Sequence, residues 1–288
     1  MTVVPILGAG SSMADYKIGF KWWALIIAVV FVISELVCVA CVPERPVACD
    51  EKPGKISDMF KALFKNDQAM TVVVSIILVY TSLNICGNLV LYFFRFDVGN
   101  EGAYSIFAAV AFAAQVLVMM VIPLLRKRFS KSQLFISGFI IQIAGFAVIL
   151  IMAFAKLYTP QSWYILCLLG ILIYLGYGML NVIMTIFLSD SVDYGEVMNG
   201  TREESVIFSM QTFTVKLASG VAVFLAGLVV DWIHLDTAAA VQTQDTLDAL
   251  RMWMTIPSVI LLIVGIFVFK RFYKLDDTRM EEIKSKLN

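Results

Sequence analysis

Charged residues are scarce in this chain, and histidine is nearly absent. Only 15% of its 288 residues are Asp, Glu, Lys or Arg and 60% are hydrophobic, against roughly 25% and 45–50% in soluble domains. One histidine and five dispersed cysteines without a CxxC pair offer no metal-ligand spacing. The chain has no HExxH motif and no nucleophile beside His234, which argues against an enzyme. A formal net charge of zero argues against nucleic acid binding.

The apolar residues gather in long runs, and the mean hydropathy is +0.86. A helix needs about 20 apolar residues to cross the roughly 30 Å hydrocarbon core of a lipid bilayer. Seven runs meet this requirement: about 22–42, 70–94, 103–125, 134–155, 163–188, 206–230 and 252–270. They predict an all-α membrane protein with seven transmembrane helices. The glycines of "LGYG" (175–178) predict that two of these helices pack closely.

Basic residues are distributed unequally between the two sides of the predicted membrane. Alternate connections hold 16 Lys and Arg on one side and five on the other. Because Lys and Arg are enriched in cytoplasmic loops, this count predicts an outside N-terminus and a cytoplasmic C-terminus. Apolar residues at helical spacing over 56–64 predict an amphipathic helix, lying on the membrane surface or packed under the bundle. The stretch "DDTRMEEIKSKLN" (276–288) in the tail predicts an exposed charged helix or a disordered segment.

Lys216 is the most unusual polar residue inside a predicted span. Ser209, Thr212, Lys216 and Ser219 are spaced 3, 4 and 3 residues apart, so they share one helix face. A buried cation costs at least a few kcal/mol in a membrane, and it therefore needs a partner or a water-filled cavity. A substrate or coupling role and a fixed ion pair are both compatible with this pattern. Glu35 is the only acid well inside another span.

Amide side chains form a second group of candidates. They are Asn84 and Asn88, one turn apart, and then Gln115, Gln142 and Asn181 in later spans. Amides inside membrane helices bond to a neighbouring helix more often than to a ligand. Among the later amides, Asn181 is the strongest candidate for contact with a substrate.

The run "SDSVDYGEVMNGTREES" (189–205) carries six charged residues between two apolar runs. We expect it to be a connection in which Gly195 and Gly200 allow a sharp reversal. Arg202 can pair bidentately with Asp190 or Asp193. Such a cluster can hold two helix ends together in one conformation and release them in another, which is the behaviour of a gate.

This run and the helix after it resemble the glycoside–pentoside–hexuronide:cation symporter family of the major facilitator superfamily, and its melibiose permease branch in particular. The shared pattern is "DYGE…G.R.ES…FS.QTF..K", from Asp193 to Lys216. The segments "VPERP" (42–46) and "RFYKLDDTRMEEI" are also similar to family sequences. The resemblance implies a cytoplasmic gate, whose residues here would be Asp190, Asp193, Tyr194, Glu196, Arg202 and Glu203.

The resemblance also implies an architecture of twelve helices, of which the seven spans would be helices 6 to 12: the C-terminal six-helix half plus helix 6. The expected parts are 1–42 (extracytoplasmic N-terminus and helix 6), 43–69 (cytoplasmic central loop), 70–270 (transporter domain) and 271–288 (cytoplasmic tail). Helices 1 to 5 would belong to a separate N-terminal half. The implied location is the bacterial inner membrane.

The function implied is symport of a sugar with a coupling cation, Na⁺ or H⁺, without another cofactor. On the family pattern, Thr212 and Lys216 belong to the substrate site, and Asn181 stands where the melibiose permease branch has an aromatic residue. We add Asn84 and Asn88 as candidates, and neither the sugar nor the cation follows from the residues. A seven-helix receptor and a non-transporting membrane scaffold are the alternatives.

Overall fold

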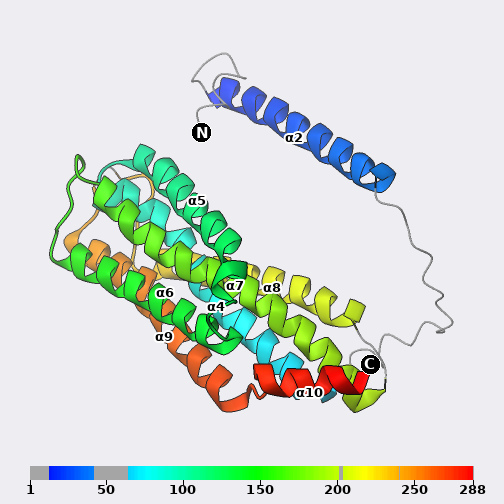
Figure 1. The fold of residues 1–288 in the computed structure, drawn as a ribbon. Helices are drawn as coiled ribbons and strands as arrows, with labels where there is room; N and C mark the ends of the chain where they lie inside the picture. Colours follow the sequence, from blue (N-terminus) through cyan, green and yellow to red (C-terminus); the bar gives the residue numbers. More distant parts are fainter. Residues whose placement is uncertain (1–12, 42–63, 201–203, 240, 288) are drawn as a thin grey trace. The chain divides into compact units, whose positions relative to one another are not determined.

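The computed structural model describes residues 13–41, 64–200, 204–239 and 241–287, and the chain divides into two compact units. The first unit, Met1–Gly54, contains helix α2 (Met13–Cys41). The second unit, Lys55–Asn288, contains the remaining helices (Figure 1). They are α4 (Asp67–Tyr92), the π-helical turn η1 (Phe93–Asp97), α5 (Glu101–Leu125), α6 (Lys131–Phe154), α7 (Tyr164–Asn199), α8 (Glu204–Trp232), α9 (Gln244–Phe272) and α10 (Asp277–Leu287).

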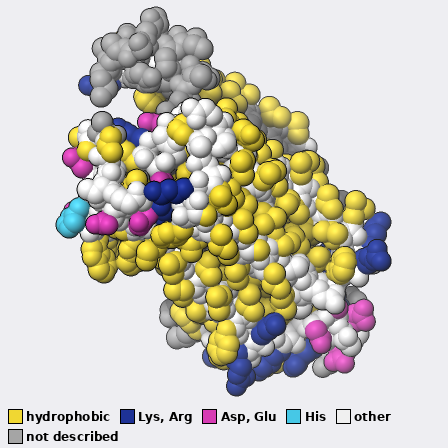
Figure 2. Space-filling view, turned by 90° about the vertical axis from the view of Figure 1, so that its left-hand side faces the viewer, with side chains coloured by type: hydrophobic (Ala, Val, Ile, Leu, Met, Phe, Trp, Pro, Cys, Tyr) yellow, Lys and Arg dark blue, Asp and Glu magenta, His cyan; other side chains and the backbone are white. Residues whose placement is uncertain are grey.

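Seven helices of the described chain are long and apolar enough to cross a membrane, which confirms the predicted all-helical class and number of spans. Figure 2 shows one face of the molecule, on which hydrophobic side chains fill the middle and charged side chains lie toward the ends, as expected of membrane-spanning helices. The amphipathic helix expected over 56–64 lies outside the described residues, apart from Phe64.

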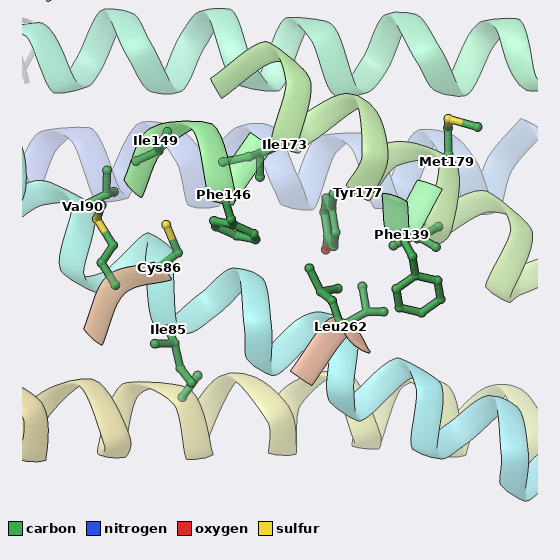
Figure 3. Close-up of a cluster of buried hydrophobic side chains, with 14 of the residues drawn as sticks. Ile85, Cys86, Val90, Phe139, Phe146, Ile149, Ile173, Tyr177, Met179 and Leu262 are labelled. Carbon is green, nitrogen blue, oxygen red and sulfur yellow. The ribbon is translucent and has the colours of Figure 1, made fainter. Parts of the chain in front are cut away.

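Helices α4 and α7 form the centre of the second unit. Helix α7 packs extensively on α5 and α6, while α4 packs on α8 and α9, and α4 and α7 also touch each other (Figure 1). Between them lies one continuous hydrophobic core, part of which Figure 3 shows. In that view Tyr177 points from α7 into the bundle, toward Leu262 of α9.

Two glycines on opposite sides of Tyr177 allow α7 to approach both of its neighbours. A Cβ atom at Gly176 would lie 2.6 Å from the Gly138 carbonyl oxygen on α6. A Cβ atom at Gly178 would lie 2.5 Å from Val118 on α5. Both distances are shorter than van der Waals contact allows, so only glycine fits. The close packing predicted from "LGYG" is confirmed.

Helix α7 is longer than its apolar run, so part of the predicted connection is wrong. The helix continues from the expected end at residue 188 to Asn199. Gly195 therefore lies inside a helix and makes no turn, whereas Gly200 ends the helix with a φ of 74°, as expected of a turn glycine. Hydrophobicity predicts only the part of a helix that lies in the hydrocarbon core. Backbone hydrogen bonds can continue the helix beyond that part, as they do in α7.

A buried charge cluster joins the helices at one end of this unit, which we call the Asp97 end. Arg251 of α9 donates to both carboxylate oxygens of Asp97, from Nε at 2.8 Å and from Nη2 at 2.5 Å. The Tyr158 hydroxyl donates to the same carboxylate at 2.5 Å. The Arg251 and Asp97 side chains are 4% and 3% exposed. Burial raises the pKa of Tyr158, and Asp97 raises it further, so this phenol stays protonated.

Because the Asp97 carboxylate would remain buried without its cation, we expect Arg251→Leu to destabilise the protein by about 3 kcal/mol or more. Thermal unfolding of the purified chain in detergent measures this loss. Asp248→Asn is the matched control, because Asp248 also pairs with Arg251, at 2.6 Å, but its side chain is 38% exposed. Equal melting temperatures for the two variants would contradict the importance of the Asp97 pair.

Candidate functional site

The opposite end of the unit, which we call the α10 end, carries a second charge cluster. Lys131, the first residue of α6, forms an ion pair with Asp190 of α7, and both side chains are less than 10% exposed. Asp277 lies 3.4 Å from the Lys131 ammonium and accepts a hydrogen bond from Arg126 at 3.3 Å. A lysine is unfavourable at a helix N-terminus, and the two carboxylates compensate for this position.

Asp277 connects the C-terminal helix α10 to this cluster. Partial burial raises the pKa of Asp277, but Arg126 and Lys131 outweigh that effect and hold the pKa below its ordinary value. The buried residues Met280 and Ile283 anchor α10 from its apolar side, packing with Leu275 against the half-buried Tyr194 and Tyr273. The tail over 277–287 is therefore a helix, as one of the two alternatives expected, but it is docked through Met280 and Ile283, and the alternative of disorder was wrong.

Two amides at the start of α4 bind the backbone of α7 and of the α9–α10 connection at the same end. Asn66 caps α4 by accepting from the Ala69 amide at 2.9 Å, and its Nδ2 donates to the Ser191 carbonyl of α7 at 2.8 Å. Gln68 accepts from the Lys274 amide at 2.8 Å. Gly195 makes room for this arrangement, since a Cβ atom there would lie 2.7 Å from Asn66 Nδ2.

The predicted gate residues thus fall into different environments. Asp190 is buried against Lys131, and Tyr194 packs on the side chains of α10. Asp193 and Glu196 are half-buried on the last turns of α7. Arg202 and Glu203 lie outside the described residues, so the proposed pairing of Arg202 stays a prediction.

Away from both ends, a polar group joins α4, α7 and α8; we call it the Tyr80 group. Asn181 donates from Nδ2 to the Tyr80 hydroxyl at 2.6 Å. Asn84 donates to the Tyr80 carbonyl at 2.7 Å, and Asn88 to the Asn84 carbonyl at 2.7 Å. Gln211 of α8 donates to the Thr185 hydroxyl at 3.2 Å. The group consists of Tyr80, Asn84, Asn88, Asn181, Thr185 and Gln211. Of the predicted substrate residues, Asn181 bonds across helices to Tyr80, whereas Asn84 and Asn88 bond to carbonyls of their own helix α4.

Thr212 and Lys216 belong to a different surface. They are exposed on the side of α8 that lies opposite its buried residues Ile207, Thr214 and Ala218. Ser209, Gly220 and Gly227 are exposed on the same side, and we call these five residues the α8 stripe. Lys216 makes no hydrogen bond or ion pair with any residue that the structure describes, and a Cβ atom at Gly220 or Gly227 would meet nothing within 4 Å.

Several residues of these clusters escaped the sequence analysis. Tyr80 precedes Asn84 by one helical turn, so the spacing Tyr80, Asn84, Asn88 could have identified it as a polar stripe. Lys131 and Arg126 carry no comparable signal, because they belong to a run of four basic residues in a short connection. Such residues normally remain in solvent, and only the fold brings Lys131 to Asp190.

Gly195→Ala is expected to destabilise the protein relative to Gly220→Ala. Both substitutions replace a helical glycine and gain about 1 kcal/mol of helix propensity. Only the first displaces Asn66, with a loss of about 1 kcal/mol for the helix cap and a similar amount for the bond to Ser191. The difference in thermal unfolding between the two purified variants measures this contact. A melting temperature for Gly195→Ala as high as that of Gly220→Ala would contradict the role assigned to Asn66.

The chain is similar to carriers and transporters of sugars in curated collections of proteins. An uncharacterized symporter, YjmB, of Bacillus subtilis (strain 168) is 25% identical over 274 residues, covering 94% of this chain and 58% of the relative. The raffinose carrier protein of Pediococcus pentosaceus is 23% identical and covers 100% of this chain and 44% of the relative. The isoprimeverose transporter of Lactiplantibacillus pentosus is 24% identical, and the match covers 96% of this chain and 56% of the relative.

The chain therefore spans about half the length of the curated relatives that it matches. The match to the family described as MFS/sugar transport protein extends over residues 1–277, which is nearly the whole sequence. This extent, together with the seven long apolar helices and the absence of strands from the part of the chain that the structure describes, identifies the family. The protein belongs to the MFS/sugar transport protein family.

Proposed function

We propose that this chain is the helix 6–12 portion of a sugar:cation symporter that works by alternating access. The observation that carries the proposal is the Tyr80 group, in which Tyr80 and Asn181 place a hydroxyl and an amide near the middle of the α4 and α7 spans, and Gln211 adds an amide from the first third of α8. Amide and hydroxyl groups form neutral hydrogen bonds with sugar hydroxyls, and a ligand or water must satisfy those that remain unpaired. Membership of a sugar transport family supports this assignment.

The α8 stripe supports the proposal that a further helix bundle completes the site. A lysine that faced hydrocarbon at this depth would cost at least a few kcal/mol. Small residues such as Gly220 and Gly227 let a neighbouring membrane helix approach closely. We therefore propose that the segment corresponding to the remaining length of the relatives covers this stripe. It would provide an acidic partner for Lys216 and the second half of the sugar and cation sites, either in the same polypeptide or in another one.

In this mechanism the sugar binds near the midplane of the bacterial inner membrane, and entry of Na⁺ or H⁺ drives its uptake. Lys216 would link the two sites electrostatically, with Thr212 beside it. The distribution of Lys and Arg supports an outside N-terminus and a cytoplasmic α10 end. The gate would then lie on the cytoplasmic side, where Asp193, Glu196, Arg202 and Glu203 respond to the approach of the other half.

Asp190 takes a different part in this proposal. Its partner Lys131 belongs to the same packed unit, and both side chains are buried. Rocking of two halves as rigid bodies leaves contacts within each half intact. We therefore propose that Asp190 braces α6, α7 and α10 in both conformations, with Tyr194 packed on α10 in the same unit, while Asp193, Glu196, Arg202 and Glu203 change partners.

Uptake of radiolabelled sugars by cells that express the chain tests the proposal. The panel contains melibiose, a xyloside and a glucuronide, each with and without a co-expressed helix 1–5 half and with Na⁺ or at acidic pH. We expect accumulation of at least one sugar with the complete set of helices, and a loss of tenfold or more in Lys216→Ala.

Lys270→Ala is the matched control, since Lys270 is exposed in the last turn of α9 and should leave uptake unchanged. Immunoblots of membrane fractions show whether each variant is inserted. If no sugar of the panel is taken up, or if Lys216→Ala transports like the unmodified protein, the symporter assignment is wrong. Binding without uptake would instead favour a scaffold or receptor.

A further inference from the structure

The hydrogen bond between Asn181 and Tyr80 is the contact of the Tyr80 group that links side chains of α4 and α7. Asn181 Nδ2 lies 2.6 Å from the Tyr80 hydroxyl oxygen, and both residues are half-buried. The Tyr80 ring meets the edge of the Tyr177 ring, with centroids 5.5 Å apart and planes at 77°. Because Tyr177 is 8% exposed and held between close-packed helices, it fixes the position of the Tyr80 ring.

This arrangement leaves hydrogen-bonding capacity for a ligand. An amide has one acceptor oxygen and two N–H donors, and a phenol has one rotatable O–H donor besides its acceptor lone pairs. Asn181 uses one N–H on Tyr80, the Tyr177 hydroxyl also interacts with both of these residues, and no residue that the structure describes donates a hydrogen bond to Asn181 Oδ1. The Tyr80 oxygen is occupied as an acceptor, so its own hydrogen points elsewhere. An acceptor and a donor thus stand side by side.

The surroundings of this pair favour a polar ligand over hydrocarbon. Four residues beyond Asn181, on the same face of α7, Thr185 is exposed and holds Gln211 of α8. Tyr80 itself is near the middle of the Asp67–Asp97 span. Lipid chains offer no hydrogen bonds, so the free Tyr80 O–H and Asn181 Oδ1 would be costly at this depth if they faced hydrocarbon.

We infer that Tyr80 determines sugar specificity, with its O–H donating to one sugar hydroxyl while Asn181 Oδ1 accepts the proton of that same hydroxyl. The inference rests on the proposed transport of sugars. It assigns to Tyr80 the recognition of one hydroxyl position on the sugar ring. A site built to bond a hydroxyl discriminates strongly against an analogue without it, because its own polar groups are then left unpaired.

Binding of monodeoxy sugars to the Tyr80→Phe variant tests this inference. The protein is the full chain, purified with the co-expressed helix 1–5 half, and the probes are methyl β-xyloside, methyl α-galactoside and methyl β-glucuronide with their monodeoxy analogues. Isothermal titration gives the affinities. In the unmodified protein we expect one deoxy position to cost tenfold or more. Tyr80→Phe should bind the parent sugar about tenfold more weakly and should distinguish it from that deoxy analogue much less than the unmodified protein does, because only the bond to Asn181 Oδ1 remains.

Tyr174→Phe is the matched control, because Tyr174 lies one turn from Tyr177 on α7 but lines a small apolar cavity with Cys86 and Gly87. It should keep the unmodified preference among the analogues. Asn181→Ala is a second variant and should lose discrimination at the same position of the sugar as Tyr80→Phe. Agreement between these two variants would show an effect on one hydroxyl rather than general loosening of the helices.

The outcomes separate the two proposals. If the unmodified protein binds a parent sugar and Tyr80→Phe keeps the same deoxy preference, or loses affinity equally for every analogue, the specificity role of Tyr80 is wrong while sugar binding stands. If the unmodified protein binds none of the three parent sugars, the proposed function and the inference both fail.

Discussion

Ion pairs that are withdrawn from water fix how α4, α6, α7, α9 and α10 meet in the second unit. At the Asp97 end, Arg251 of α9 closes on the carboxylate that follows α4. At the α10 end, Lys131 of α6 pairs with Asp190 of α7 and with Asp277. Apolar surfaces in a membrane can slide past one another with little change in free energy, because lipid is as apolar as a side chain. Buried charges oppose such sliding, since every displacement separates a cation from its anion.

Between its two charged ends, the unit contains polar groups whose hydrogen-bonding capacity is not fully used within the bundle. The Tyr80 group has hydrogen bonds within the bundle but retains unused capacity, and the α8 stripe faces away from the bundle altogether. This division suits a transporter: the ends maintain the shape of a rigid half, and the middle remains available for a substrate and for the other half. Helix α8 packs mainly on α4 and has few contacts with α7. It carries the α8 stripe on its exposed side.

Composition and motifs predicted the architecture well, and the site only in part. Runs of apolar residues reveal spans because the bilayer requires them, so the helices are found where hydrophobicity places them. The continuation of α7 to Asn199 was missed because backbone hydrogen bonding does not depend on hydrophobicity. The motif around Asp190 was recognised, yet its partner was expected nearby in the sequence at Arg202. Lys131 lies 59 residues away, and only the packing of α6 on α7 brings it into reach.

The glycines beside Tyr177 also bear on how this protein tolerates change. Gly176 meets mainly the backbone of α6, whereas Gly178 meets the Val118 side chain and the Gln115 carbonyl of α5. Replacements elsewhere on α6 can therefore accumulate without shifting Tyr177 or Tyr80, whereas a larger residue at Val118 would displace α7. Related proteins could replace the polar residues around the site and so bind a different sugar, while Tyr177 and helix α7 kept their positions. Gly176 and Gly178 themselves tolerate little change, because an added Cβ atom would push α7 away from α6 or α5.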